Sequence, residues 1–262
     1  MGIAIHQVDA FTDKPFAGNP AAVCVLTAPR AECWMQSVAA EMNLSETAFL
    51  HPEGDDYRLR WFTPVVEVAL CGHATLAGAH VLWETCELPA TAPARFHTKS
   101  GLLTCVRNRE GIEMDFPARV AEPADAPAGL AEALGMQPLF VGRSAYDYLV
   151  EADSAATLRK LKPDFSQLGR LPVRGVIVTS RSDRVEFDFV SRFFAPASGV
   201  NEDPVTGSAH CSLGPFWQSR LNKSEFVAYQ ASARGGVVKV RVAGDRIFLG
   251  GRAVTVLRGE LL

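Results

Sequence analysis

The sequence lacks the features that mark several large classes of protein. It has no run of about 18 or more apolar residues, which a membrane-spanning helix needs. It has no long basic run, and its formal net charge is −3, so nucleic acid is not an expected partner. The opening stretch, MGIAIHQVDAF, has neither a basic region nor a long apolar region, so no signal peptide is predicted. We therefore expect a globular protein without a membrane segment.

Closely spaced cysteine pairs are also missing. Six scattered cysteines with no CxxC spacing predict reduced thiols in a cytoplasmic protein. Two histidines, His73 and His80, stand seven residues apart, which places them on one helix face but about 10 Å from each other. One ion cannot bind both, so we do not expect a metal site at these histidines. The cysteines are Cys24, Cys33, Cys71, Cys86, Cys105 and Cys211.

What the sequence does contain is one segment that occurs twice. Residues 60–76 read RWFTPVVEVALCGHATL, and residues 192–213 read RFFAPASGVNEDPVTGSAHCSL. The two arginines are 192 − 60 = 132 residues apart and the two glycines 207 − 72 = 135 apart, while half of the 262-residue chain is 131. A constant offset near half the chain length indicates an internal duplication.

The order of predicted elements supports two similar domains of the α+β class. A Pro- and Ala-rich segment without apolar periodicity, residues 118–129, predicts a linker between an N-terminal repeat domain (1–117) and a C-terminal repeat domain (130–262). Strand-like alternation dominates both halves. Helical spacing or small-residue content predicts helices in four places, over residues 32–44, 72–86, 155–168 and 207–221.

Each copy of the repeated segment opens a predicted helix with small residues. Gly72 begins the first helix, and Thr206 and Gly207 begin the second. The N-terminus of a helix has unpaired N–H groups and attracts carboxylate or phosphate, so two such ends facing one cleft would suit a small anion. The alternative is that glycine and alanine only allow close packing of the helices.

Polar residues differ between the copies, and one more stands upstream. The first copy has Cys71 and His73, whereas the second has Asp203 and Ser208. Glu46 precedes the apolar stretch TAFL, where it is either an exposed charge at a strand end or a buried acid with a raised pKa. Periodicity alone leaves both interpretations open.

Together the sequence blocks resemble the PhzF-like family of phenazine-biosynthesis isomerases. The matching blocks are VDAFTDKPFAGNPAAV, LSETAFL, RWFTPVVEVALCGHATLAGAH and GVNEDPVTGSAHCSL, in the expected order over nearly the whole chain. The family has the diaminopimelate epimerase fold. This resemblance implies two pseudo-symmetric domains, each a mostly antiparallel curled sheet around a central helix, with the active site in the cleft between them.

The resemblance also implies a reaction and a set of residues. In the phenazine enzyme a glutamate, here Glu46, moves a proton within trans-2,3-dihydro-3-hydroxyanthranilate without a cofactor. His73, Asp203 and Ser208 would assist it. A homodimer and a small anionic substrate, either amino-acid-like or a cyclic hydroxy acid, are further expectations. The implied substrate-binding residues are Asn19, Gly72, Thr206 and Gly207.

Two alternatives remain at this stage. Diaminopimelate epimerase uses one cysteine from each half, and Cys71 stands at the first of these positions. The second half has no cysteine there, because Cys211 comes four residues after Gly207 inside the predicted helix, so a two-cysteine racemase is disfavoured. The other alternative is a binding protein that keeps the fold without the activity, since fold does not fix function.

Overall fold

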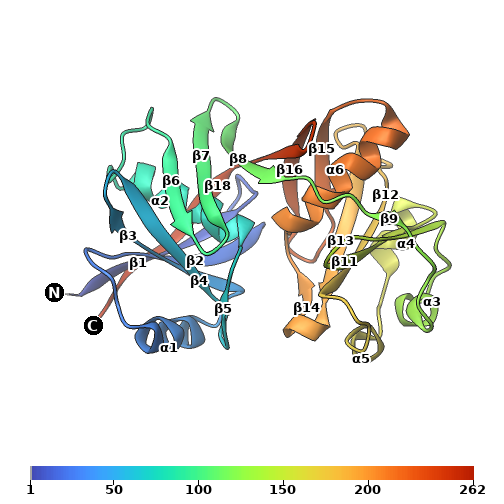
Figure 1. Cartoon of the computed structure of the whole chain (residues 1–262), viewed down its shortest axis with the longest axis horizontal. Helices are drawn as coiled ribbons and strands as arrows, with labels where there is room; N and C mark the ends of the chain where they lie inside the picture. The colour runs from blue at the N-terminus through green and yellow to red at the C-terminus, as the bar shows by residue number, and fades with distance from the viewer. Residues whose placement is uncertain (1) are drawn as a thin grey trace. The chain divides into compact units, whose positions relative to one another are not determined.

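The computed structural model describes residues 2–262 and divides into two compact units (Figure 1). Residues 2–115 and 249–262 form the first unit, and residues 116–248 form the second. The chain passes from the first unit to the second within one strand and returns within another, so the units are not simply the two halves of the sequence.

The elements follow one another in a similar order in both units. The first unit contains β1 (Ile3–Ala10), β2 (Asn19–Val25), α1 (Glu32–Met42), β3 (Glu46–Glu53), β4 (Asp56–Phe62), β5 (Glu67–Val68), α2 (Gly72–Glu84), β6 (Ala94–Thr98), β7 (Gly101–Asn108), most of β8 (Gly111–Pro117) and β18 (Ala253–Leu261). The second unit contains β9 (Glu122–Pro123), α3 (Leu130–Leu134), β10 (Phe140–Arg143), β11 (Asp147–Glu151), α4 (Ala155–Lys160), α5 (Phe165–Leu168), β12 (Gly175–Arg181), β13 (Phe189–Ala195), the 3₁₀ turn η1 (Pro196–Ser198), β14 (Val200–Asp203), α6 (Gly207–Leu221), β15 (Glu225–Gln230), β16 (Gly236–Ala243) and the first part of β17 (Arg246–Gly251).

Strand pairing repeats from one unit to the other. In the first unit β1 runs antiparallel to β2, β2 parallel to β3, β3 antiparallel to β4, β4 parallel to β6, and β6 antiparallel to β7. In the second unit β10, β11, β12, β13, β15 and β16 pair in the same sequence of directions. The mixed, mostly antiparallel sheets and few helices form an α+β fold, and the shared pairing supports the predicted duplication.

The units of the structure differ from the predicted domains, which were bounded at residues 117 and 130. The end of the chain, residues 249–262, belongs to the first unit. Strand β18 pairs with β1 along its whole length, from Ile3 opposite Leu261 to Ala10 opposite Ala253. Strand β9, inside the segment predicted as a linker, pairs with β10 of the second unit. Each repeat thus ends in a strand that joins the first strand of the other repeat. The composition of this segment did not reveal β9. Its proline suggested a loop although proline is tolerated at a sheet edge, and two residues are too few to show periodicity.

One predicted helix, over residues 155–168, is wrong as a continuous element. The structure has two short helices, α4 and α5, with a break between them. Pro163 stands in the break, and proline restricts the residue before it to extended conformations. Asp164 then caps α5 by accepting a hydrogen bond from the Gln167 N–H at 3.0 Å. The other three predicted helices are present as α1, α2 and α6.

Helices α2 and α6 are the most buried helices of their units. Most side chains of α2 are buried, and it contacts β1, β2, β3 and β18 of the same unit (Figure 1). A Cβ on Gly78 would stand 3.3 Å from Leu50, and one on Gly214 of α6 would stand 3.1 Å from Val240. Glycine at these points therefore allows strand and helix to approach closely, which supports the packing role considered from the sequence.

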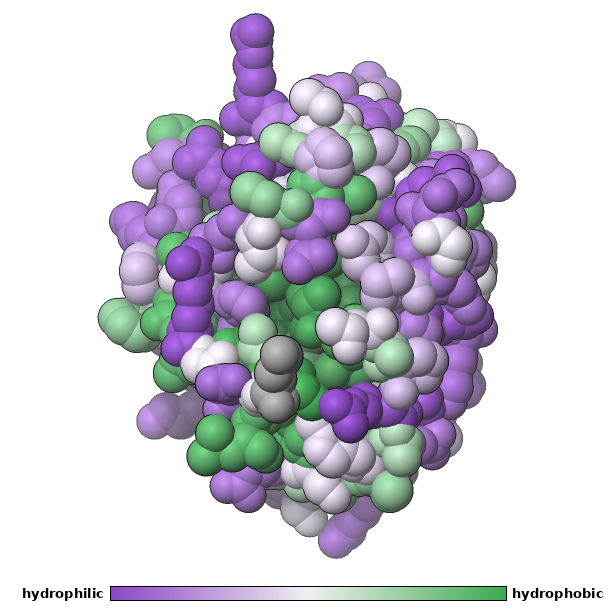
Figure 2. Space-filling view, turned by 90° about the vertical axis from the view of Figure 1, so that its left-hand side faces the viewer, coloured by the Kyte–Doolittle hydropathy of each residue, from purple (hydrophilic) through white to green (hydrophobic). Residues whose placement is uncertain are grey.

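One face of the first unit carries apolar side chains in its middle. Figure 2 shows them gathered at the centre of this face, with hydrophilic side chains around the rim. Among residues 2–262, no helix combines the length and the hydrophobicity that crossing a membrane requires.

Candidate active site

Two strands and one helix of the first unit begin close to one another. Asn19 is the first residue of β2, Glu46 is the first residue of β3, and His73 follows the first residue of α2. Because β2 and β3 are parallel and pair with Glu46 opposite Ala21, their starting residues lie at the same edge of the sheet. The chain folds these residues from three distant segments into one cluster.

Hydrogen bonding fixes the state of His73. The side-chain amide nitrogen of Asn19 lies 3.1 Å from His73 Nδ1, and an amide nitrogen can only donate. Nδ1 therefore accepts, and the ring proton of the neutral imidazole is assigned to Nε2. His73 Nε2 lies 3.2 Å from Glu46 Oε2. Within residues 2–262 no atom makes a well-aligned hydrogen bond to Nε2, so this buried donor faces the Glu46 carboxylate without a hydrogen bond of good geometry.

Burial sets the charge of this histidine. His73 is fully enclosed, and loss of solvation lowers its pKa from 6.5 to about 3. At neutral pH the ring is therefore uncharged and serves as a hydrogen-bond donor. The side chain of Glu46 is 18% exposed, between the two environments considered from the sequence. The side chain is thus partly open to solvent although its Oε2 atom is buried, a position that suits a group that must reach a substrate.

Cys71, which stands at the first epimerase-cysteine position, also belongs to this cluster. It is the N-cap residue of α2, is 7% exposed, and places its sulfur 3.5 Å from His73 Nδ1. The ligand atoms of Glu46, Cys71 and His73 lie within 4.8 Å of one another, which raises the question of a metal ion. Glu46 and Cys71, however, contact opposite nitrogens of the ring. One ion binds one ring nitrogen, so this arrangement fits proton transfer better than a metal.

A second polar cluster forms around the start of α6 in the second unit. The Thr206 hydroxyl donates to Asp203 Oδ2 at 2.5 Å, and the Gln230 amide donates to the Asp203 carbonyl oxygen at 2.7 Å. Gln230 also accepts from the Thr206 N–H at 2.9 Å. These bonds hold Asp203 and Thr206 in place beside Gly207 and the half-buried Ser208. Sequence reasoning missed Gln230, since a polar residue at the end of an apolar strand gives no distinctive signal.

His210 lies one turn further along α6 and is fully buried. Its Nδ1 lies 2.8 Å from the Thr206 carbonyl oxygen, and its ring is stacked on that of Phe189. Burial lowers the pKa of His210 to about 4, so this ring is neutral at pH 7. The structure thus gives His210 a packing and hydrogen-bonding position.

The two copies differ at the positions that matter for chemistry. Strand β12 pairs with β13 in the same register as β3 with β4, so Gly175 corresponds to Glu46. A Cβ at Gly175 would stand 2.6 Å from the ring of Phe193, which leaves no room for an acid. Likewise Ser208 corresponds to His73 at the offset of 208 − 73 = 135. An acid at this strand start and a histidine at this helix position therefore occur only in the first unit.

The predicted site residues thus form two groups. Asn19, Glu46, Gly72 and His73 come together in the first unit. Asp203, Thr206, Gly207 and Ser208 come together in the second. Each group has the internal hydrogen bonds that hold polar side chains in fixed positions, which is a requirement for either catalysis or specific binding.

Comparison with solved structures defines the class of fold. A crystal structure of a hydroxyproline epimerase from Agrobacterium vitis matches with a TM-score of 0.65 at 11% identity, covering 99% of this chain and 92% of that one. A PhzF-family protein from Enterococcus faecalis matches with a TM-score of 0.96 at 42% identity over the full length of both chains. The fold is therefore the two-domain curled-sheet fold of the epimerase-like proteins.

Sequence comparison then gives the family. The model of the family described as phenazine biosynthesis-like protein, PhzC-PhzF, matches residues 8–259. An uncharacterized isomerase from Halalkalibacterium halodurans is 59% identical over 263 residues, covering 100% of this chain and 99% of that protein. The chain belongs to the PhzF-like family, and the names of its relatives support an isomerase.

Proposed function

We propose that the protein is a cofactor-independent isomerase that moves a proton within a small carboxylate substrate, with Glu46 as the general acid and base. The observation that carries this proposal is the position of Glu46, whose side chain is partly exposed and whose Oε2 lies 3.2 Å from a histidine that is neutral and hydrogen-bonded to Asn19. A carboxylate that can both accept and return a proton needs no oxidant, metal or nucleotide.

The proposed steps conserve atoms and charge. The Glu46 carboxylate removes a proton from one carbon of the substrate, and the electron pair of that C–H bond moves into the conjugated system. Glu46, now a carboxylic acid, returns the proton to a different carbon, which restores the carboxylate. The Nε2–H of His73 donates a hydrogen bond to the oxygen on which negative charge develops. A neutral donor stabilises this charge without giving up its own proton.

Asp203, Thr206, Gly207 and Ser208 have a binding role in this proposal. The N–H groups of the first turn of α6 and the Ser208 hydroxyl would bind a carboxylate of the substrate, since a helix N-terminus favours negative charge. The hydrogen bonds of Asp203 and Gln230 to Thr206 would keep this turn in its geometry. The substrate class remains amino-acid-like or a cyclic hydroxy acid.

Cys71 favours a second candidate, an amino-acid racemase or epimerase. Its sulfur lies 3.5 Å from His73 Nδ1, close to the proposed acid and base. In a racemase Cys71 would act as a second acid or base beside Glu46, whose carboxylate oxygen lies within 4.8 Å of the Cys71 sulfur. Cys71→Ser separates the two candidates, because it abolishes racemisation while an isomerase that depends on Glu46 alone keeps its rate within about tenfold.

The experiment is proton NMR in D₂O, with trans-2,3-dihydro-3-hydroxyanthranilate first and then a panel of amino and hydroxy acids. Three proteins are compared: the parent, Glu46→Gln, and the control Glu53→Gln, which changes the last residue of the same strand, β3. We expect deuterium incorporation by the parent and the control, and a loss of about 100-fold or more in Glu46→Gln. Exchange at the parental rate in Glu46→Gln would contradict the assignment of Glu46.

Two further outcomes bear on the proposal. Tight binding of a panel compound by the parent without any deuterium exchange would support the binding-protein alternative. The expected homodimer is checked separately by light scattering, which gives the mass in solution for comparison with the 28.3 kDa chain.

A further inference from the structure

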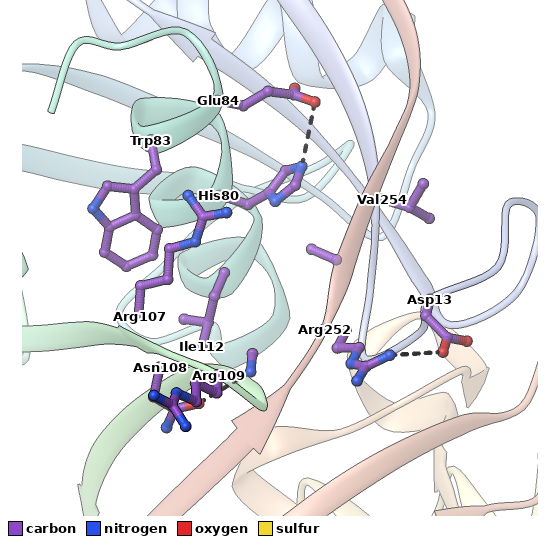
Figure 3. A pocket seen from close by; sticks show the side chains of 12 residues that line it. Asp13, His80, Trp83, Glu84, Arg107, Asn108, Arg109, Ile112, Arg252 and Val254 are labelled. Carbon is purple, nitrogen blue, oxygen red and sulfur yellow. Dashed lines mark hydrogen bonds and ion pairs between the residues drawn. The ribbon is translucent and has the colours of Figure 1, made fainter. Parts of the chain in front are cut away.

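The first unit has a pocket away from the Glu46 cluster, at the C-terminal end of α2. Its volume is about 450 Å³, within the usual size of small-molecule sites. Its walls come from α2, from the turn between β7 and β8, and from the beginning of β18 (Figure 3). His80 and Trp83 line the pocket from the helix, and neither Glu46 nor His73 contributes to it.

The charged groups around this pocket are not balanced. Three arginines and two acids line it, a difference of 3 − 2 = +1, in a chain whose net charge is −3. Both acids already have partners: Asp13 pairs with Arg252 at 3.1 Å, and Glu84 pairs with Arg258 at 3.1 Å. Glu84 also accepts a hydrogen bond from Thr255 at 2.6 Å. The acids therefore leave the other two arginines uncompensated.

Those two arginines, Arg107 and Arg109, have no hydrogen bond or ion pair from their side chains to any group in residues 2–262. Arg107 extends toward His80 and Trp83 in Figure 3. The charge of Arg107 also affects His80. Burial makes the largest contribution to lowering the pKa of His80, the charges of Arg107 and Arg258 lower it further, and the charge of Glu84 raises it. An exposed guanidinium directed into a pocket is a ready binding group for carboxylate or phosphate.

The pocket also has an apolar side. Trp83 and Ile112 line it and are each only 5% exposed, so both are fixed by packing. The Trp83 ring nitrogen donates to the Ala92 carbonyl oxygen at 3.0 Å, which holds the ring. A site with fixed apolar groups and a few converging charged groups is the usual composition of a small-ligand site.

We propose that this pocket binds a small organic anion bearing a phosphate group or paired carboxylates, with its charged end on Arg107 and Arg109 and its apolar part toward Trp83 and Ile112. This site is separate from the proposed catalytic cluster, and the inference does not rest on the proposed function. The two are nonetheless linked by α2, which has His73 in its first turn and His80 in its last part.

The test is isothermal titration calorimetry with two probes, pyrophosphate and citrate, at ionic strength matched with sodium chloride. The parent is compared with the double variant Arg107→Ala/Arg109→Ala. The control is Arg181→Ala, which removes an exposed arginine of the second unit outside the pocket. Circular dichroism and a melting temperature establish that each variant is folded. If the double variant is destabilised, the single variants Arg107→Gln and Arg109→Gln replace it.

We expect saturable binding of one equivalent per chain, weakened about tenfold or more in the double variant and unchanged in the control. Binding of pyrophosphate alone identifies a phosphate ligand, and binding of citrate alone identifies a polycarboxylate. The proposal is overturned if neither probe binds in a saturable way, or if the control loses as much affinity as the double variant.

Discussion

At the scale of single residues, the proposed chemistry depends on a histidine whose behaviour is set by its neighbours. Asn19 determines which nitrogen of His73 carries the proton, and burial keeps the ring neutral. A neutral ring with its proton on Nε2 presents a donor to the Glu46 side. Glu46 can then act as the only proton carrier, since a ring with a pKa of about 3 does not compete for the proton at neutral pH.

Replacing Asn19 tests this arrangement. In Asn19→Ala the His73 Nδ1 loses the amide that donates to it, so the proton is no longer confined to Nε2. We expect isomerase activity to fall about 10- to 100-fold, in line with the usual effect of removing a group that orients a functional histidine. The ¹⁵N NMR shifts of the His73 ring give the tautomer directly. An unchanged tautomer in the variant would show that Asn19 does not control it.

The buried histidines also predict how stability depends on pH. His73 and His210 have pKa values of about 3 and about 4 in the folded protein, whereas an unfolded histidine titrates near 6.5. The unfolded state therefore binds more protons below pH 6.5, and the free energy of unfolding falls as the pH drops from 6.5 toward 4. Each histidine contributes up to about 1.4 kcal/mol per pH unit in that window.

Urea denaturation at several pH values between 4 and 7 measures this slope. The variant His210→Gln removes one of the two groups, so its slope should be shallower than that of the parent by up to about 1.4 kcal/mol per pH unit. Equal slopes in the two proteins would mean that His210 is already protonated in the folded state at these pH values.

Single residues also show what the sequence could and could not predict. The family motifs singled out Glu46 and His73, and the structure brings both together. The position of Cys71 could not be predicted, because only the structure shows its sulfur next to His73. Gln230 was missed because its importance comes from bonds to Asp203 and Thr206, which are distant in sequence. Side-chain contacts between separate segments are not encoded in local periodicity.

At the scale of elements, an arginine–glutamate pair is repeated in both units. Arg60 of β4 binds Glu67 through two hydrogen bonds of 2.7 and 2.8 Å. Arg192 of β13 binds Glu202 in the same way, at 2.7 and 2.9 Å. In each unit the pair ties a long strand to the short strand that leads into α2 or α6. The arginines that first revealed the duplication therefore have a structural role, which is to fix the entry to these helices.

Removing the second of these pairs should be costly. The Arg192 side chain is 11% exposed and also donates to the carbonyl oxygens of Leu158 and Leu161. Arg192→Met leaves Glu202 and both carbonyls without this partner, so we expect a loss of about 3 kcal/mol in the free energy of unfolding. The matched control is Arg58→Ala, whose pair with Glu53 is about 38% exposed on each side.

Urea denaturation of the two variants makes the comparison. For Arg58→Ala the expected loss is below about 1 kcal/mol, because solvent screens an exposed pair. A loss in Arg192→Met no greater than that in Arg58→Ala would show that the buried pair does not hold the element in place.

Elements were predicted well where periodicity is long and poorly where it is short. Helix α6 has the predicted bounds, Gly207–Leu221, since its run of small and apolar residues lies between a Thr-Gly start and an Asn end. The helix predicted over 155–168 failed because a helical pattern of hydrophobic residues continues across Pro163 while the backbone cannot. Strand β9 has too few residues to give any pattern.

At the scale of the whole molecule, the two repeats exchange their last strands. Strand β18 follows the second repeat in sequence but pairs with β1 of the first unit, and β9 follows the first repeat but pairs with β10 of the second. The exchange could not be predicted from the duplication, since a repeat pattern does not specify which copy a closing strand joins. It means that neither half of the sequence contains all the strands of a unit.

This exchange predicts that a fragment cut at the apparent domain boundary is incomplete. Residues 2–117 lack β18, so β1 would have one paired edge and one open edge with unpaired N–H and C=O groups. We expect this fragment to be unfolded or aggregated.

Because Leu261 lies opposite Ile3, residues 249–262 can be placed ahead of residue 2 through a short Gly/Ser linker. The rearranged fragment should be soluble and unfold cooperatively. Circular dichroism and thermal melting decide the matter, with a scrambled β18 sequence as the control. Equal folding with the native and scrambled strands would mean that the β1–β18 pairing does not complete the first unit.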